Sequence, residues 1–195
     1  MTVEPDAAAV AAVLRGKPVT LTTALEPEAA GGLPMAAGFY AWWVEAGTNA
    51  GVPHHPHPAK PELGLLYVGI SPKRPSSSGL IRSRVINQHV TGNTSSSTFR
   101  FVLASLLLDE LGLRPRTTIK KVVLDPDDNA RLRQWQFDHT SLSWCERPRP
   151  WEIEDAVIAL MQPPLNSAAN QNHQFYPRVQ AARAAFRAAG RASTP

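Results

Sequence analysis

The sequence contains a single cysteine, Cys145, among its 195 residues, so the chain cannot form an internal disulfide. Low cysteine usage is typical of proteins from a reducing compartment, and we therefore expect a cytoplasmic protein. Long apolar runs are also missing, because the longest is the eight-residue segment FVLASLLL, far shorter than a membrane span. The first residues, MTVEPD, are acidic rather than basic, which argues against a secretory signal peptide. We expect no membrane partner.

Acidic residues are absent from two long stretches of the chain. None occurs at residues 63–108, where the basic residues are Lys73, Arg74, Arg82, Arg84 and Arg100. None occurs at residues 156–195, where the arginines are Arg178, Arg183, Arg187 and Arg191. Segregated positive charge is typical of proteins that bind polyanions, although solvated helix faces are also often basic. The charge pattern therefore favours a nucleic-acid partner.

Hydrophobic periodicity and turn signals divide the chain into helices and strands. Strands are predicted at residues 38–46, 64–71 and 141–146, with further candidates at 19–25 and 117–124. Helices are predicted at residues 6–15, 80–90, 97–112, 125–139 and 150–161, and in the tail from residue 177. The strands at 38–46 and 64–71 are consecutive and are expected to pair antiparallel. The pattern indicates an α/β mixture with antiparallel hairpin character.

Two short motifs, each with a glycine and a tyrosine, occupy the first two main strands. The first is Gly-Phe-Tyr, which ends at Tyr40, and the second is Tyr-Val-Gly, which begins at Tyr67. The predicted helix at 80–90 then carries Arg84 and His89. The predicted helix at 150–161 carries a glutamate, Glu154, and leads into Pro-Pro-Leu-Asn. The asparagine of this segment, Asn166, lies twelve residues after Glu154.

In the order Tyr, Tyr, Arg, His, Glu, Asn, the chain resembles the GIY-YIG nuclease superfamily over roughly residues 34–170. The segment GNTSSSTFRFVLASLLL also resembles a bacterial branch of that superfamily. The resemblance implies an α/β (α+β) fold, with a small central antiparallel three-stranded sheet flanked by helices and with additional terminal helices. It divides the chain into an N-terminal helix and strand extension (1–33), a nuclease-like domain (34–170) and a basic C-terminal helix (171–195).

The resemblance also implies a Mg²⁺- or Mn²⁺-dependent endonuclease that acts on DNA and needs no organic cofactor. Phosphodiester hydrolysis requires an activated water and relief of charge on the phosphoryl oxygens. One carboxylate can hold a hydrated Mg²⁺, which makes Glu154 the expected metal ligand. Arg84 would clamp the phosphate, because a guanidinium is planar and permanently charged.

The remaining family positions have expected roles around the same reaction. Tyr40 would be the general base or would position the attacking water, although a phenol ordinarily titrates near pH 10. Tyr67 would support it or contact the phosphate, and His89 would relay the proton or bond a phosphate. Asn166 would hold the active-site backbone or the water shell of the metal. The expected nucleic-acid contacts are Lys73, Arg74, Arg82, Arg100, Arg178, Arg183 and Arg187.

The spacing of arginine and histidine departs from the family pattern, in which the arginine commonly sits four residues before the histidine. Here Arg84 lies five residues before His89, and Val85 occupies the position four before it. Arg82 lies seven before His89, which returns to the same face of an ideal helix. Either the helix holds an extra residue, or Arg82 shares the role, or His89 is not the matching residue. We take Arg84 as the clamp.

Other interpretations of these residues are open at this stage. The tyrosines can be ordinary strand aromatics, and Glu154 can be a first-turn acid that interacts with the helix dipole. Two alternative functions follow: a nucleic-acid-binding module that no longer cuts, and a protein-interaction domain on the same fold. A fold alone does not decide between them, because function depends on the site.

Overall fold

The computed structural model of the chain describes residues 3–48, 50–119 and 121–193. Its first elements are α1 (Val3–Leu14), β1 (Val19–Thr20), α2 (Leu21–Leu25) and the 3₁₀ helix η1 (Glu28–Ala30). The middle of the chain forms β2 (Gly38–Glu45), β3 (Pro56–His57), β4 (Lys60–Ser71), α3 (Ile81–Arg84), the π-helix η2 (Val85–Val90) and α4 (Thr98–Leu106). The last elements are β5 (Arg116–Thr117), β6 (Val122–Val123), α5 (Pro126–His139), β7 (Thr140–Glu146), η3 (Pro150–Glu152), α6 (Glu154–Met161) and α7 (Tyr176–Ala192).

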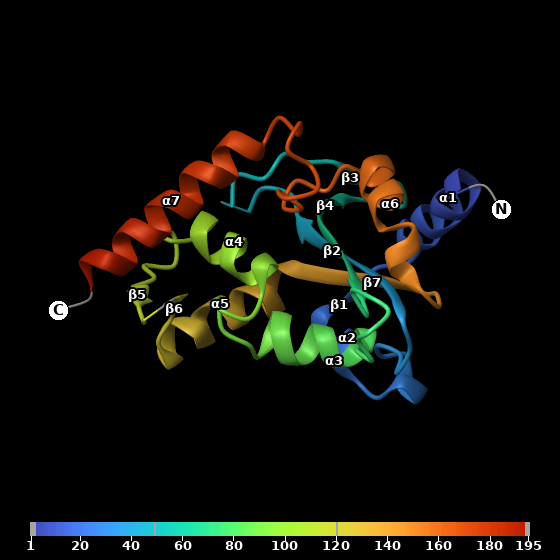
Figure 1. Cartoon of the computed structure of the whole chain (residues 1–195), viewed down its shortest axis with the longest axis horizontal. Coiled ribbons are helices and arrows are strands. Elements are labelled where there is room, and N and C mark those ends of the chain that lie inside the picture. The colour runs from blue at the N-terminus through green and yellow to red at the C-terminus, as the bar shows by residue number, and fades with distance from the viewer. Residues whose placement is uncertain (1–2, 49, 120, 194–195) are drawn as a thin grey trace.

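The main sheet has five strands in the order β1-β7-β2-β4-β3, and all neighbours pair antiparallel. Its three central strands are the three main strands predicted from the sequence, and β1 and β3 add only two residues each at the edges. The predicted antiparallel sheet flanked by helices is therefore confirmed, with two short edge strands in addition. Figure 1 shows this sheet in the middle of the molecule.

Several predicted elements are corrected by the structure. The expected strand at 19–25 ends at Thr20, because the Thr20 side chain accepts a hydrogen bond from the Thr23 amide and starts α2. The expected strand at 117–124 is instead the separate hairpin β5–β6. A hydrogen bond from the Thr118 amide to the Lys121 carbonyl closes its turn. Residue 120 lies outside the described residues. The expected helix at 97–112 ends at Leu106 and continues as turns.

The sheet separates two hydrophobic cores, because successive strand residues point to opposite faces. On one face, Tyr40, Trp42 and Tyr67 pack with residues from α2, α3, η2, α4, α5 and α7. On the other face, Phe39 and Trp43 pack with α1 and α6. The two groups of helices lie on opposite sides of the sheet in Figure 1.

A β-bulge puts both motif tyrosines on the same face of the sheet. The register between β2 and β4 shifts between Trp42 and Trp43, where Trp42 pairs with Tyr67 and Trp43 with Leu65. Leu66 is the extra residue, and both Leu66 and Tyr67 belong to the core that contains Tyr40. A bulge re-aims the side chains that follow it. Without the extra residue, Tyr67 would share the face of Leu65.

The terminal helices pack on the central sheet and its flanking helices. α1 packs against α6 and β7, and α7 packs against α4 and the β5–β6 hairpin. Figure 1 places α1 and the end of α7 at opposite ends of the long axis. Among the described residues, no helix combines the length and apolar character that crossing a membrane requires.

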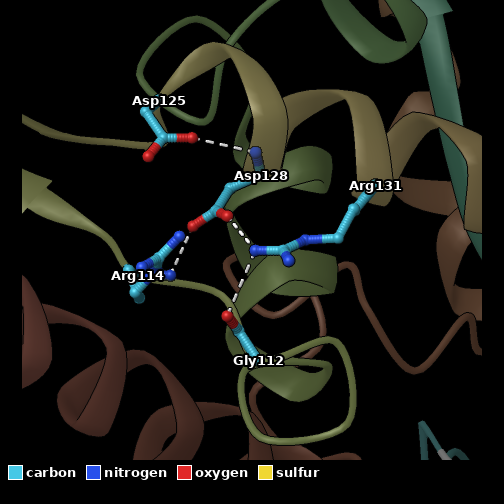
Figure 2. Close-up of polar contacts among 5 residues, drawn as sticks. All are labelled: Gly112, Arg114, Asp125, Asp128 and Arg131. Atoms are coloured by element: carbon cyan, nitrogen blue, oxygen red, sulfur yellow. Dashed lines mark hydrogen bonds and ion pairs between the residues drawn. The ribbon is translucent and has the colours of Figure 1, made fainter.

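The start of α5 is fixed by the aspartates of the segment DPDD. Figure 2 shows Asp125 accepting a hydrogen bond from the Asp128 amide at 2.9 Å, which caps the helix. The fully buried Asp128 accepts from the Arg114 amide and from the Arg131 guanidinium, which also reaches the Gly112 carbonyl. These contacts tie the turns after α4 to α5, which in turn packs behind the candidate site.

Candidate functional site

The two glycine-tyrosine motifs fit together as a cradle for one phenol ring. Tyr40 pairs with Gly69 across β2 and β4. A Cβ at Gly69 would lie 2.4 Å from the Tyr40 Cζ, so only a glycine leaves room for the ring. A Cβ at Gly38 would lie 2.1 Å from the Cys145 carbonyl oxygen, so this glycine allows β7 to approach β2 closely. The glycines therefore determine where the Tyr40 hydroxyl lies.

The Tyr40 hydroxyl begins a buried chain of hydrogen bonds. It lies 2.6 Å from His89 Nε2, and His89 Nδ1 lies 2.7 Å from Ser97 Oγ. Ser97 caps α4 by accepting a hydrogen bond from the Arg100 amide at 3.0 Å. Tyr40 is 0% exposed and His89 is 1% exposed. A sequence pattern does not reveal the contact between Ser97 and His89, because this contact depends on the tertiary fold.

Burial sets the protonation of this pair. Burial raises the pKa of Tyr40 well above its ordinary value, and the nearby Tyr67 raises it further, whereas the charge and hydrogen bond of Arg84 lower it. Burial also lowers the pKa of His89 well below its ordinary value, and Arg84, Lys73 and Arg100 add to the effect. Both side chains are therefore neutral near pH 7, and His89 can accept a proton.

A π-helical turn accounts for the spacing of Arg84 and His89. η2 follows α3 directly, and its wider turn ends with a hydrogen bond from the Thr91 amide to the Ile86 carbonyl, five residues back. Such a turn holds one more residue than an α-helical turn. Arg84 affects the pKa values of both Tyr40 and His89, and it donates to Gln88, the residue before His89. The helix does contain an extra residue.

Arg82 and Arg100 have internal partners instead of lying free at the surface. The Arg82 guanidinium donates to the carbonyls of Leu25 and Glu26 at 2.8 and 2.7 Å, which anchors α3 to the end of α2. Arg100 is 0% exposed. The expectation that Arg100 contacts nucleic acid is therefore corrected, because its buried side chain cannot reach a ligand at the surface.

The buried Arg100 instead supports the π-helical turn. Its guanidinium donates to the His89 carbonyl at 3.1 Å, to Gln136 and to both oxygens of Asn129. Gln136 also donates to the His89 carbonyl at 3.1 Å. Two donors from different helices thus hold the backbone of the histidine. Sequence analysis missed Gln136, because nothing in a helix pattern distinguishes it from a surface glutamine.

Glu154 begins α6 and shares an electrostatic environment with Arg84 and Lys73. Burial raises the pKa of the half-buried Glu154, whereas the charges of Lys73 and Arg84 lower it and Asp155 raises it. The charge of Glu154 also affects the pKa values of Tyr40 and Tyr67. The charges of Arg84 and Glu154 therefore act on each other and on the two motif tyrosines.

An open hollow of about 410 Å³ lies beside this group of residues. Its walls come from the end of β4, the following loop, α3 and η2, and they include Lys73, Arg74 and Arg84. Lys73 and Arg74 are exposed. The hollow can receive an anionic group next to the buried Tyr40 and His89.

Tyr67 and Asn166 complete the set of family positions. Burial raises the pKa of Tyr67 to about 12, and its ring packs 5.0 Å from the Phe99 ring and 6.1 Å from the His89 ring. Asn166 accepts from the Val68 amide at 2.9 Å and donates to the Val68 carbonyl at 2.7 Å. Its amide group therefore holds the middle residue of the second motif, and it is not directed at a metal's water shell.

The C-terminal arginines lie on α7, apart from the hollow described above. Arg178 is exposed in the first turn of the helix, whereas Arg183 and Arg187 face the ring of Phe101 in α4. Neither Arg183 nor Arg187 lines the hollow at Lys73. Both line a different hollow, near the start of α4.

His89 makes the stability of the fold depend on pH in a defined direction. Its pKa is lowered in the folded chain, so the unfolded chain binds a proton that the folded chain does not. The stability that the buried neutral His89 contributes is fully present above pH 6.5, the ordinary pKa of histidine. It is lost as the pH falls below that value. We expect urea unfolding between pH 7 and 5 to show a steeper loss of stability for the wild type than for His89→Gln, by up to about 1.4 kcal/mol per pH unit. Equal slopes would contradict a buried neutral His89.

Comparison with known families is consistent with this geometry. No curated protein and no solved structure was found to match the chain. A family model described as the GIY-YIG catalytic domain matches residues 38–185, from the first motif into α7. Proteins with this domain typically use a divalent metal and act on nucleic acids. The match covers the strands with both tyrosines, the π-helical turn with His89, and Glu154, so the chain belongs to the GIY-YIG family, which indicates nuclease activity.

Proposed function

We propose that the protein is a divalent-metal-dependent endonuclease that hydrolyses phosphodiester bonds in DNA. The observation that supports this most strongly is the 2.6 Å contact between the Tyr40 hydroxyl and His89 Nε2, in the electrostatic field of Arg84 and Glu154. An ordinary structural tyrosine needs neither a neutral buried histidine nor a neighbouring guanidinium. A tyrosine that acts as a base needs a group to which it can pass its own proton, and a nearby positive charge stabilises the charge that develops in the transition state.

Tyr40 and His89 would act together as the base. The neutral His89 would hold its hydrogen on Nδ1, donated to Ser97, so that Nε2 accepts the Tyr40 hydroxyl hydrogen. When water attacks phosphorus and the bond to the leaving oxygen breaks, the phenol oxygen would take a proton from the water as its own proton passes to Nε2. The leaving oxygen would take its proton from solvent. The raised pKa of Tyr40 and the lowered pKa of His89 disfavour a separated phenolate and imidazolium. Both transfers should therefore be concerted with the attack.

Substrate binding would uncover the buried phenol. Arg84 and Lys73 are long side chains at the hollow beside Tyr40, and both would be drawn onto phosphate oxygens. Arg84 would hold the phosphate in a bidentate manner, because its guanidinium is planar. Arg74 would contact an adjacent phosphate from the exposed rim of the same hollow.

The donor set at Glu154 fits a hydrated Mg²⁺ or Mn²⁺. Among the described residues there is no group of three or more histidine, cysteine or acidic side chains that could enclose a metal. Mg²⁺ commonly keeps several waters and takes one or two carboxylates together with phosphate oxygens. Glu154 would hold the ion, which would supply positive charge to the phosphoryl and leaving oxygens.

Metal removal tests this function. Supercoiled plasmid and labelled single-stranded, double-stranded and branched DNA and RNA would be incubated with the wild type in Mg²⁺, Mn²⁺ or EDTA, with binding measured in parallel. We expect cleavage with either ion and none in EDTA, because the metal stabilises the charge of the transition state. Binding that weakens with salt, without cleavage of any substrate, would favour the non-catalytic binding module. The absence of both binding and cleavage would favour the protein-interaction alternative.

A further inference from the structure

Two adjoining hollows lie near the start of α4, separate from the hollow at Lys73. Their volumes are about 200 Å³ and about 470 Å³. Three segments distant in sequence form their walls: the loop before α4, the β5–β6 hairpin and α7. Together they form a surface that we call the α7 recess, defined by Thr94, Ser95, Phe101, Lys121, Arg183 and Arg187.

The charge of the α7 recess is positive and uncompensated. None of the described residues that line the two hollows is acidic. The loop before α4 and α7 come from the two stretches of sequence that lack acidic residues. Within the described part of the chain, neither Arg183 nor Arg187 belongs to an ion pair. Burial lowers the pKa of Arg183, and the charge of Arg187 lowers it further, so the fold holds two like charges together.

Phe101 arranges the two arginines side by side. The guanidinium carbons of Arg187 and Arg183 lie 5.0 and 5.7 Å from the centre of its ring. Such cation–π contacts orient a guanidinium while leaving its N–H groups available to an anion. Arg183 Nη1 also donates to Ser167 Oγ at 3.4 Å, which helps to fix the orientation of the guanidinium. The hydroxyls of Ser95 and Thr98 border the same space and can donate to phosphate oxygens.

We propose that the α7 recess binds a backbone phosphate of the nucleic acid at a distance from the bond that is cut. The inference rests on the proposed function for its ligand, a polynucleotide. Two adjacent guanidiniums with hydroxyl donors and no acid are suited to a phosphodiester. The recess and the Tyr40–His89 pair both adjoin the start of α4, because Ser97 lines the recess and also binds His89 Nδ1. A nucleic-acid strand bound both at the α7 recess and at the hollow at Lys73 would be fixed relative to Tyr40.

The chain offers a matched control for this site. Arg187 and Arg191 are both exposed and lie one turn apart on α7, but only Arg187 lines the recess. Arg187→Gln and Arg191→Gln would each be made in a Glu154→Gln background, and binding of fluorescent duplex DNA would be followed from low to high salt. We expect Arg187→Gln to reduce the slope of log K against log salt by about 0.9, the value for one lost phosphate contact. Arg191→Gln should leave the slope unchanged.

Each outcome separates this inference from the proposed function. Cleavage by the wild type, with equal slopes for the Arg187 and Arg191 variants, would overturn the recess but leave the nuclease intact. A reduced slope for Arg187→Gln alone, without cleavage by the wild type, would support the recess and contradict the enzyme. Competition by inorganic phosphate that depends on Arg187, with duplex binding unaffected by the substitution, would show a site for small phosphates and overturn the proposal. The absence of DNA binding would also overturn it.

Discussion

Replacing Tyr40 with phenylalanine should lower the single-turnover rate of DNA cleavage by about 10²- to 10⁴-fold, the usual contribution of general acid–base catalysis. The substitution removes only the oxygen that lies 2.6 Å from His89 Nε2. The ring should stay in the space that Gly69 leaves for it. The lost hydrogen bond leaves a buried nitrogen unpaired, which should cost about 1–3 kcal/mol of stability. Rates should therefore be compared well below the melting temperature of both proteins.

The chain has a control for this variant. Tyr176 begins α7, outside the catalytic group, so Tyr176→Phe should cleave at the wild-type rate. Tyr67→Phe gives a second comparison, because Tyr67 shares the face of Tyr40, but the ring nitrogens of His89 lie against Tyr40 and Ser97 instead. A Tyr40→Phe enzyme as fast as Tyr176→Phe would show that Tyr40 is a packing residue and that the base lies elsewhere.

Replacing Glu154 with glutamine should abolish metal-dependent cleavage, with a loss of about 10³-fold or more if the metal supplies several kcal/mol of charge stabilisation. Glutamine keeps the size of the side chain but not the charge that holds a hydrated cation. Higher Mg²⁺ should not restore the rate, whereas DNA binding should persist, because Lys73 and Arg84 remain in place. The measurement is the cleavage rate across a Mg²⁺ titration.

Asp155 is a matched control for Glu154, because it is the next residue of the same helix turn and is exposed. Asp155→Asn removes one negative charge from the same place in the helix, and it should leave the Mg²⁺ dependence close to that of the wild type. Equal losses for both variants would show that the charge of the helix start matters, rather than a specific ligand. A fully active Glu154→Gln would remove Glu154 from the site.

Much of the fold follows from local sequence patterns. The apolar and aromatic runs of the main strands and the acidic start of α5 predict those elements, because each signal depends on residues close in sequence. The lengths of β1 and of the β5–β6 hairpin were mispredicted, since Thr20 and Thr118 make local hydrogen bonds that compete with strand pairing. Such competition is not visible in a hydrophobic pattern.

The two motifs and the family order propose the residues of the candidate site, but the sequence does not reveal their geometry. The five-residue spacing from Arg84 to His89 is explained by a π-helical turn, which a period of 3.6 residues cannot reveal. The bulge at Leu66 that brings Tyr67 to the face of Tyr40 is likewise hidden in an apolar run. Arg100 looked like a surface cation, yet it is buried behind His89, because its partners are supplied by α5 and by the His89 backbone.

The most direct measurement compares plasmid nicking in Mg²⁺ by the wild type and by a Tyr40→Phe, Glu154→Gln double variant, purified in parallel and matched for folding by circular dichroism. The predicted result is conversion of supercoiled plasmid to nicked and linear forms by the wild type, with no conversion by the double variant. Equal nicking by both proteins, or none by the wild type with either Mg²⁺ or Mn²⁺, would contradict a phosphodiesterase site built around Tyr40, His89 and Glu154.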